Sequence, residues 1–182
     1  MSRTLCGSRC CSPLPARTPA EAVQAYRARI SRVLSCLTTA HVDVGGGYAP
    51  SDAPHALIMA GNDAVALRGA SRLTLAVSEH YTITEDSDAG WQVHRAAYFY
   101  AIGLHDTGEL LAYHWHPRGK SPVVDPHLHV RANIQLGERW LGKVHLPTGP
   151  IELEDIVSLA VNELAVEPLR EDWKLLLHEN RA

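Results

Sequence analysis

The sequence predicts an α+β fold, in which a four-stranded antiparallel meander sheet is covered on one face by C-terminal helices and preceded by an N-terminal helix. Three observations support this class. Apolar and polar residues alternate over roughly 72–136, apolar residues recur at helical spacing near both ends, and short turns join the alternating segments. The 182 residues, 46% hydrophobic and 20% charged, are enough for one hydrophobic core.

The first 58 residues differ in composition from the rest, because they hold all four cysteines and an excess of arginine. Residues 1–17 show no periodicity and are predicted to be a disordered tail. An amphipathic helix is predicted over 18–38, since Thr18-Pro19-Ala20-Glu21 offers a cap, a proline at the first helical position and a capping-box glutamate. The glycines and prolines of 39–58 indicate a linker.

A single α+β domain is therefore expected over residues 59–182. Met59 is a candidate start of the natural protein, and we expect a chain lacking residues 1–58 to keep its sheet folded. The cysteines (Cys6, Cys10, Cys11 and Cys36) lack a second pair at metal-ligand spacing, so free thiols in a reducing compartment are expected rather than a zinc site.

Four strands are predicted in order, followed by two helices. The strands are expected at about 72–83, 91–105, 110–117 and 127–136, and the turns between the first three carry Asp and Gly. One apolar helical stripe follows the break at 147–150, and a second short one begins at Trp173. These helices supply the layer that covers one face of the sheet.

Histidine stands out in the composition, with 11 residues in 182. Pairing the strands about their turns places Tyr100 opposite His114, and His114 opposite His129. One face of the sheet is then apolar and includes Phe99, Trp115 and Leu128. The other face is expected to hold a polar cluster: His80, His94, Tyr98, Tyr100, His114, His116, His127, His129 and Arg131.

Three kinds of function fit such a cluster. The leading one is metal-independent cleavage of RNA, with His114, His116, His127 and His129 as acid and base, because imidazole titrates near neutral pH and gives a bell-shaped pH profile. Tyr98 and Arg131 complete the expected catalytic group. The residues expected to bind substrate are Tyr100, Lys120, Arg118 and His94.

The second function uses the same four histidines, His114, His116, His127 and His129, as ligands of zinc, nickel or iron. In this alternative the protein holds a divalent transition metal, whereas the nuclease needs no cofactor. The third is a non-enzymatic interaction module that uses the same face. A chelator separates the first two, since only a metal centre loses its function with the ion.

The segment Glu109–Pro117, followed by Pro126–His129, resembles the TumE-type toxins of bacterial toxin–antitoxin pairs over about residues 91–131. The shared pattern is a turn with glycine, an apolar strand with tyrosine, a histidine-rich step and a later His-x-His. His114-Trp115-His116 stands where those toxins have Asp-Asn. The resemblance implies a small bacterial toxin that acts on RNA and has an antitoxin protein as its partner.

Charge and hydropathy exclude some classes of protein. The net charge of −3 excludes a strongly basic nucleic-acid coat, although it leaves a local RNA site open. No apolar run reaches the 18 or more residues of a membrane span, and the N-terminus lacks the apolar stretch of a secretory signal. We therefore expect a cytoplasmic protein without a membrane partner, and a homodimer stays open as an assembly.

Overall fold

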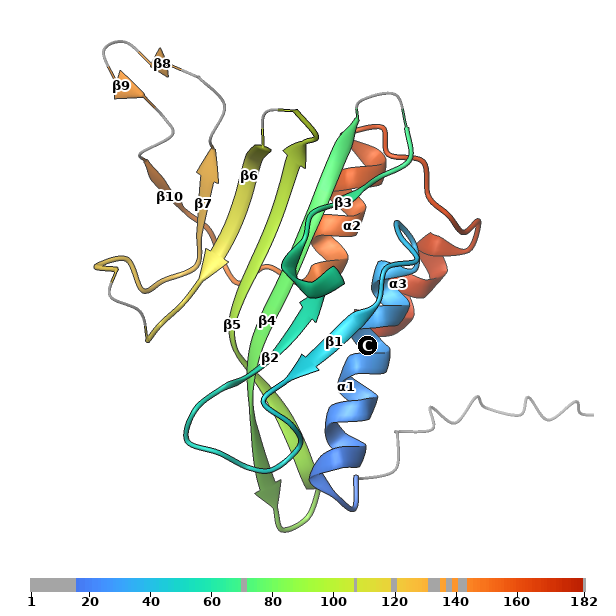
Figure 1. Ribbon diagram of the computed structural model, residues 1–182, viewed down its shortest axis with the longest axis vertical. Helices are drawn as coiled ribbons and strands as arrows, with labels where there is room; N and C mark the ends of the chain where they lie inside the picture. The colour runs from blue at the N-terminus through green and yellow to red at the C-terminus, as the bar shows by residue number, and fades with distance from the viewer. Residues whose placement is uncertain are drawn as a thin grey trace, which may run out of the picture.

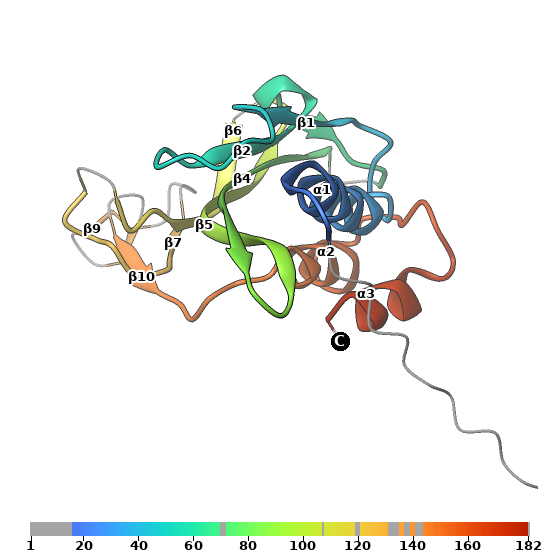
Figure 2. The same cartoon turned by 90° about the horizontal axis from the view of Figure 1, so that it is seen from below.

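A computed structural model describes residues 16–69, 72–106, 108–118, 121–130, 135–136, 139–140 and 144–181 (Figure 1). Over these residues the chain forms an eight-stranded antiparallel sheet and three α-helices. Figure 2 shows the helices gathered on one side of the sheet, with β7 and β10 at its far edge. The α+β class is confirmed, but the sheet is larger than the four strands predicted.

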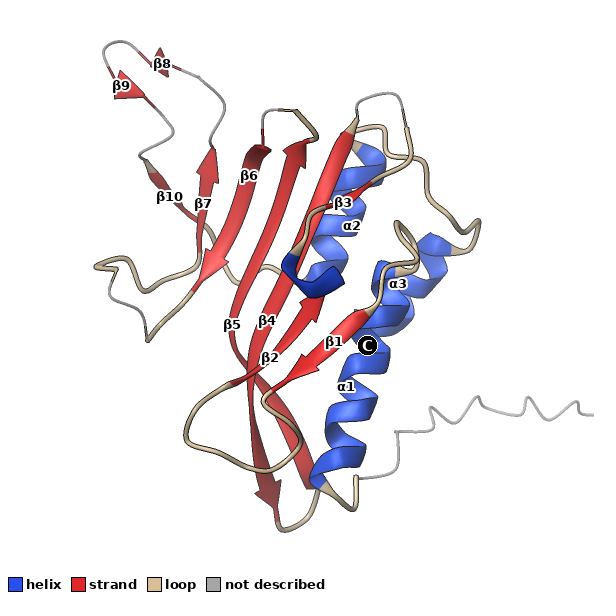
Figure 3. Ribbon diagram, in the orientation of Figure 1, coloured by secondary structure: helices blue, strands red, loops and turns tan. Residues whose placement is uncertain are grey.

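The elements follow the chain in the order drawn in Figure 3. They are α1 (Pro19–Leu34), β1 (Val42–Gly45), β2 (His55–Met59), the short 3-10 helix η1 (Ala60–Asn62), β3 (Val65–Ala66), β4 (Leu73–Asp86), β5 (Gly90–Leu104), β6 (Gly108–Trp115), β7 (His127–Val130), β8 (Gln135–Leu136), β9 (Arg139–Trp140), β10 (His145–Pro147), α2 (Leu153–Asn162) and α3 (Trp173–Arg181). The main sheet has the order β1-β2-β4-β5-β6-β7-β10, and β3 pairs with β4.

The four predicted strands correspond to β4–β7, and the two predicted C-terminal helices to α2 and α3. The linker predicted over 39–58 is wrong, because β1 and β2 lie within it and pair with each other from Val42 opposite Met59 to Gly45 opposite Ala56. β2 continues the sheet onto β4. The glycines and prolines of this segment mark the hairpin between the two strands.

The start of α1 follows the sequence signal. The Thr18 hydroxyl accepts the Glu21 backbone N–H at 3.1 Å, and the Glu21 carboxylate accepts the Arg17 backbone N–H at 2.7 Å. Just before it, the Ala16 carbonyl accepts the Trp91 N–H at 3.0 Å. Ala16 and Arg17 therefore belong to the folded chain, and the rest of the predicted tail, residues 1–15, lies outside the described residues.

The hydrophobic core lies between the sheet and the helices. α1 contributes Val23, Ile30, Val33 and Leu34, all at most 2% exposed, and they pack with buried residues of β4, β5 and α2. Met59 itself is 1% exposed. The domain boundary expected at residue 59 is therefore wrong, since the first described residues supply a layer of the core.

Two β-bulges decide which face each residue of β5 and β6 occupies. The first skips Ala96, because His80 pairs with Ala97 whereas Tyr81 pairs with Arg95. The second skips Leu110, opposite the step from Ile102 to Gly103. Each extra residue reverses the alternation of side chains beyond it.

As a result Tyr98 and Tyr100 lie on the helix side, 3% and 0% exposed, and Phe99 lies on the opposite face. The prediction that these tyrosines share the histidine face is wrong. β7 is also offset by two residues from the predicted register, with His127 opposite His114. A shift of two leaves every side chain of β7 on its predicted face.

In the part of the chain that the structure describes, no helix is both long enough and apolar enough to cross a membrane.

Candidate metal centre

Three adjacent strands bring histidines to one face of the sheet. His114 on β6 pairs with His127 on β7, and His129, two residues along β7, pairs with His145 on β10. His116 lies one residue beyond the end of β6. The opposite face of the same strands packs toward the helices, where Trp115 lies 6.0 Å from the Tyr98 ring.

His127 lies in the middle of this histidine cluster, which consists of His114, His116, His127, His129 and His145. Its ring centroid lies 5.5, 5.4, 5.0 and 4.9 Å from those of His114, His116, His129 and His145. His129 also contacts two members, at 4.8 Å from His114 and 4.4 Å from His145.

Three of these rings present nitrogen atoms to a common point. One ring nitrogen each of His114, His127 and His129 lies within 4.8 Å of the others. Zinc binds imidazole nitrogen at about 2.0–2.1 Å, so nitrogens on a tetrahedral ion stand about 3.4 Å apart. The widest separation among the three nitrogens therefore has to shorten for them to share one ion.

The surroundings of His127 select its tautomer. Its Nδ1 lies 2.8 Å from the backbone carbonyl oxygen of Asp125, and a carbonyl only accepts, so Nδ1 carries the proton. The lone pair is then on Nε2. This atom is buried and has no hydrogen-bond partner within the described part of the chain. Metal-ligating histidines commonly donate their other ring N–H to a backbone carbonyl in this way, so His127 is a candidate metal ligand through Nε2.

The five imidazoles pack closely, with neighbouring ring centroids 4.4–6.0 Å apart. His127, in the middle of the cluster, is 1% exposed. A metal ion binds the neutral form of an imidazole, so a cation shared by these rings would satisfy the Nε2 lone pair.

The four histidines predicted as the site lie together, and their catalytic or ligand roles stay predictions. Tyr98 and Tyr100 stack on each other at 4.8 Å in the core, so neither offers a ring surface to a ligand on the histidine face. His94 is exposed and hydrogen-bonds to Thr84 at 2.9 Å, without a ring contact to the described histidines. Lys120 and Arg131 lie outside the described residues.

Sequence reasoning missed His145. It lies on β10, a three-residue strand that follows the two-residue strands β8 and β9. The signal in the sequence is the His145-Leu146 step, which repeats the His127-Leu128 step of β7. Three residues are too few for periodicity to stand out.

The helix side of the sheet holds a second polar cluster around Glu79, which is 1% exposed. The hydroxyls of Tyr26 and Tyr100 donate to its two carboxylate oxygens, and Arg95 lies 3.9 Å away and pairs with Glu152 at 2.7 Å. Burial raises the pKa of Glu79 above its ordinary value, although the tyrosine hydrogen bonds and Arg95 oppose this shift. Burial and the neighbouring carboxylate raise the pKa of Tyr100 as well. The Tyr100 hydroxyl thus has a partner in the core, and the Tyr98 hydroxyl accepts the Ile151 backbone N–H at 3.2 Å.

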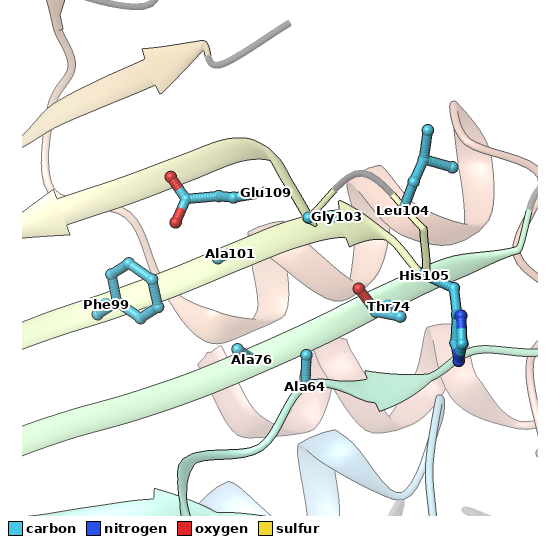
Figure 4. Close-up of a pocket in the computed structure, with 10 residues that line it drawn as sticks. Ala64, Thr74, Ala76, Phe99, Ala101, Gly103, Leu104, His105 and Glu109 are labelled. Atoms are coloured by element: carbon cyan, nitrogen blue, oxygen red, sulfur yellow. The ribbon is translucent and has the colours of Figure 1, made fainter.

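A hollow of about 330 Å³ lies farther along the histidine face, over a floor of small residues that includes Ala76, Ala101 and Gly103. Figure 4 shows the Glu109 carboxylate turned toward its Phe99 end. A Cβ on Gly103 would stand 2.6 Å from the Gly108 carbonyl oxygen, so only glycine fits there. The Phe99 ring contacts His114 edge-on at 4.8 Å, which places this hollow beside the histidine cluster.

No protein-family model, curated protein or solved structure matches this chain, so its function is inferred from the geometry of its own residues.

Proposed function

We propose that this protein holds a divalent transition metal ion, with zinc as the expected ion, through His114, His127 and His129. The observation that carries the proposal is the Nε2 atom of His127, which is buried and lacks a hydrogen bond to the described residues, in a ring that contacts the imidazoles of His114 and His129. An unpaired buried polar atom costs about 1–3 kcal/mol, and a bound cation removes this cost.

Three imidazole ligands are typical of a catalytic zinc centre, in which the fourth position takes water or substrate. Bound zinc lowers the pKa of such a water toward neutrality and acts as a Lewis acid. His116 and His145 flank the three ligands, and imidazoles in this position suit proton transfer to and from a bound water. We therefore assign the centre to hydrolytic chemistry.

Metal-independent cleavage of RNA, by the same histidines, and the relation to TumE-type toxins stay predictions. The histidine face supports the acid–base part of that mechanism, since two or more imidazoles lie within reach of one bound group. The burial of Tyr98 and Tyr100 removes two side chains that this mechanism was expected to use, Tyr98 in catalysis and Tyr100 in substrate binding. The metal proposal accounts for the His127 tautomer, and the nuclease mechanism does not require it.

Elemental analysis of the purified full chain tests the proposal. We expect about one equivalent of zinc or a related metal in the unmodified protein, and a loss of at least tenfold in occupancy for His129→Ala, because two imidazoles rarely hold zinc against dialysis. His178→Ala is the matched control, since His178 is an exposed histidine on α3 and should leave the metal content unchanged.

Absence of metal after reconstitution with zinc, nickel or iron would refute the proposal. Cleavage of RNA that persists in chelator and disappears in both His116→Ala and His127→Ala would favour the nuclease instead.

A further inference from the structure

A second hollow, of about 200 Å³, adjoins the histidine cluster on the same face of the sheet, toward the end of β5 and β6 opposite to Glu109. His80, His116 and Arg118 line it, and Ala96 and Ala97 are among its apolar walls. The bulge at Ala96 shapes this hollow, because it places two consecutive small residues opposite His80 where a regular strand would carry one.

His116 connects this hollow to the proposed metal centre. Its ring lies 6.0 Å from that of His114 and 5.4 Å from that of His127, and its side chain also lines the hollow. A ligand seated there is therefore one side chain away from the metal ligands.

Two of the polar side chains that line this hollow, His80 and Arg118, are exposed. Neither His80 nor Arg118 makes a hydrogen bond or an ion pair within the described part of the chain. Arg118 also borders a neighbouring hollow of about 670 Å³, which Ser51, Asp52 and Thr82 line, and the Asp52 carboxylate forms no ion pair with it there. A guanidinium offers several N–H donors in a planar fork that fits an oxyanion.

We propose that the hollow at His80, His116 and Arg118 is the subsite for an oxyanion group of the substrate, either a phosphate or a carboxylate. Arg118 supplies the permanent charge, and the ring N–H groups of His80 and His116 supply further donors. The proposal rests on the metal centre, because it places the anionic group beside the histidines that would hold the ion. It names the substrate class of that centre as a small anionic molecule.

Titration of the zinc-loaded full chain with inorganic phosphate, and separately with acetate, tests the subsite. We expect Arg118→Gln to weaken the binding of the preferred anion about tenfold or more and to leave the zinc content unchanged. The affinity of Arg118→Lys for that anion should lie between those of Arg118→Gln and the unmodified protein, since lysine keeps the charge and lacks the planar guanidinium fork. Arg68→Gln, which removes the same charge from an exposed site paired with Glu167 at 3.6 Å, should bind as the unmodified protein does.

The outcomes are separable. Tighter binding of phosphate assigns a phosphoryl group, and tighter binding of acetate assigns a carboxylate. Equal affinity of Arg118→Gln and the unmodified protein overturns the subsite, as does binding that depends only on His129 and the metal. A protein that takes up no metal overturns the proposed function, while the effect of Arg118→Gln on phosphate binding still decides the subsite.

Discussion

At the scale of single residues, the backbone contact of His127 determines what its imidazole can do. The Asp125 carbonyl oxygen lies 2.8 Å from Nδ1 and keeps the proton on that nitrogen, which leaves Nε2 as a buried acceptor. The same ring on an exposed strand would exchange tautomers with solvent. A backbone carbonyl in this role orients a metal ligand and raises its basicity, which is why such partners tune metal affinity.

Glu79 makes stability depend on pH in a direction that can be measured. Burial raises its pKa in the folded chain above the ordinary 4.5 expected when unfolded. The folded state then binds more protons between these two values. The contribution of Glu79 to the free energy of unfolding is complete below pH 4.5. It declines as the pH rises through the pKa of the folded state, by at most about 1.4 kcal/mol per pH unit.

Replacement of Glu79 by Gln removes this titration. We expect the free energy of unfolding of the unmodified protein, relative to Glu79→Gln, to fall as the pH is raised from 4.5 toward neutrality. Urea unfolding of both proteins at several pH values measures the difference, from which the other titrating groups cancel. A difference that stays constant with pH would show that Glu79 titrates normally.

At the scale of elements, the bulge at Ala96 determines the chemistry of both faces of β5. It directs Tyr98 and Tyr100 to Glu79 and the helices, and it leaves Phe99 beside His114. Deletion of Ala96 would reverse this alternation and expose two tyrosines. We expect the deletion to abolish cooperative thermal unfolding, whereas Ala96→Ser, which keeps the chain length, should retain it. A deletion variant with a normal melting transition would mean that the bulge can move along the strand.

The alternation of His114, His116, His127 and His129 could be predicted from the sequence, because an error of two residues in register leaves each face unchanged. The faces that Tyr98 and Tyr100 occupy could not be predicted in this way. A bulge is an extra residue that the composition of a strand does not reveal. The pair Ala96-Ala97 is compatible with a regular strand. His145 was missed for a related reason, since its strand is three residues long.

At the scale of the whole molecule, the N-terminal segment is a layer of the fold. α1 covers the sheet, and β1 and β2 extend it, whereas glycine and proline content predicted a linker there. Composition reports local flexibility, and it does not report pairing with strands that follow later in the chain. The order β4-β5-β6-β7 was predictable because these strands are sequential neighbours in the chain.

Removal of residues 1–58 therefore tests the whole-molecule arrangement. The truncated chain loses the buried side chains of α1 together with two strands, so we expect no cooperative melting transition and exposure of the core face of β4. Circular dichroism during heating measures this, with a chain lacking only residues 1–15 as the control. A cooperative transition in the chain that starts at Met59 would show that the sheet is stable without its N-terminal layer.

X-ray absorption spectroscopy at the edge of the bound metal tests the metal centre most directly, because it reports the ligand atoms themselves. The geometry of His114, His127 and His129 predicts about three imidazole nitrogens, at about 2.0–2.1 Å if the ion is zinc. His129→Ala should lower the imidazole count or empty the site. A first shell of sulfur, or of oxygen without imidazole scattering, would place the metal elsewhere and contradict the assignment of the histidine cluster.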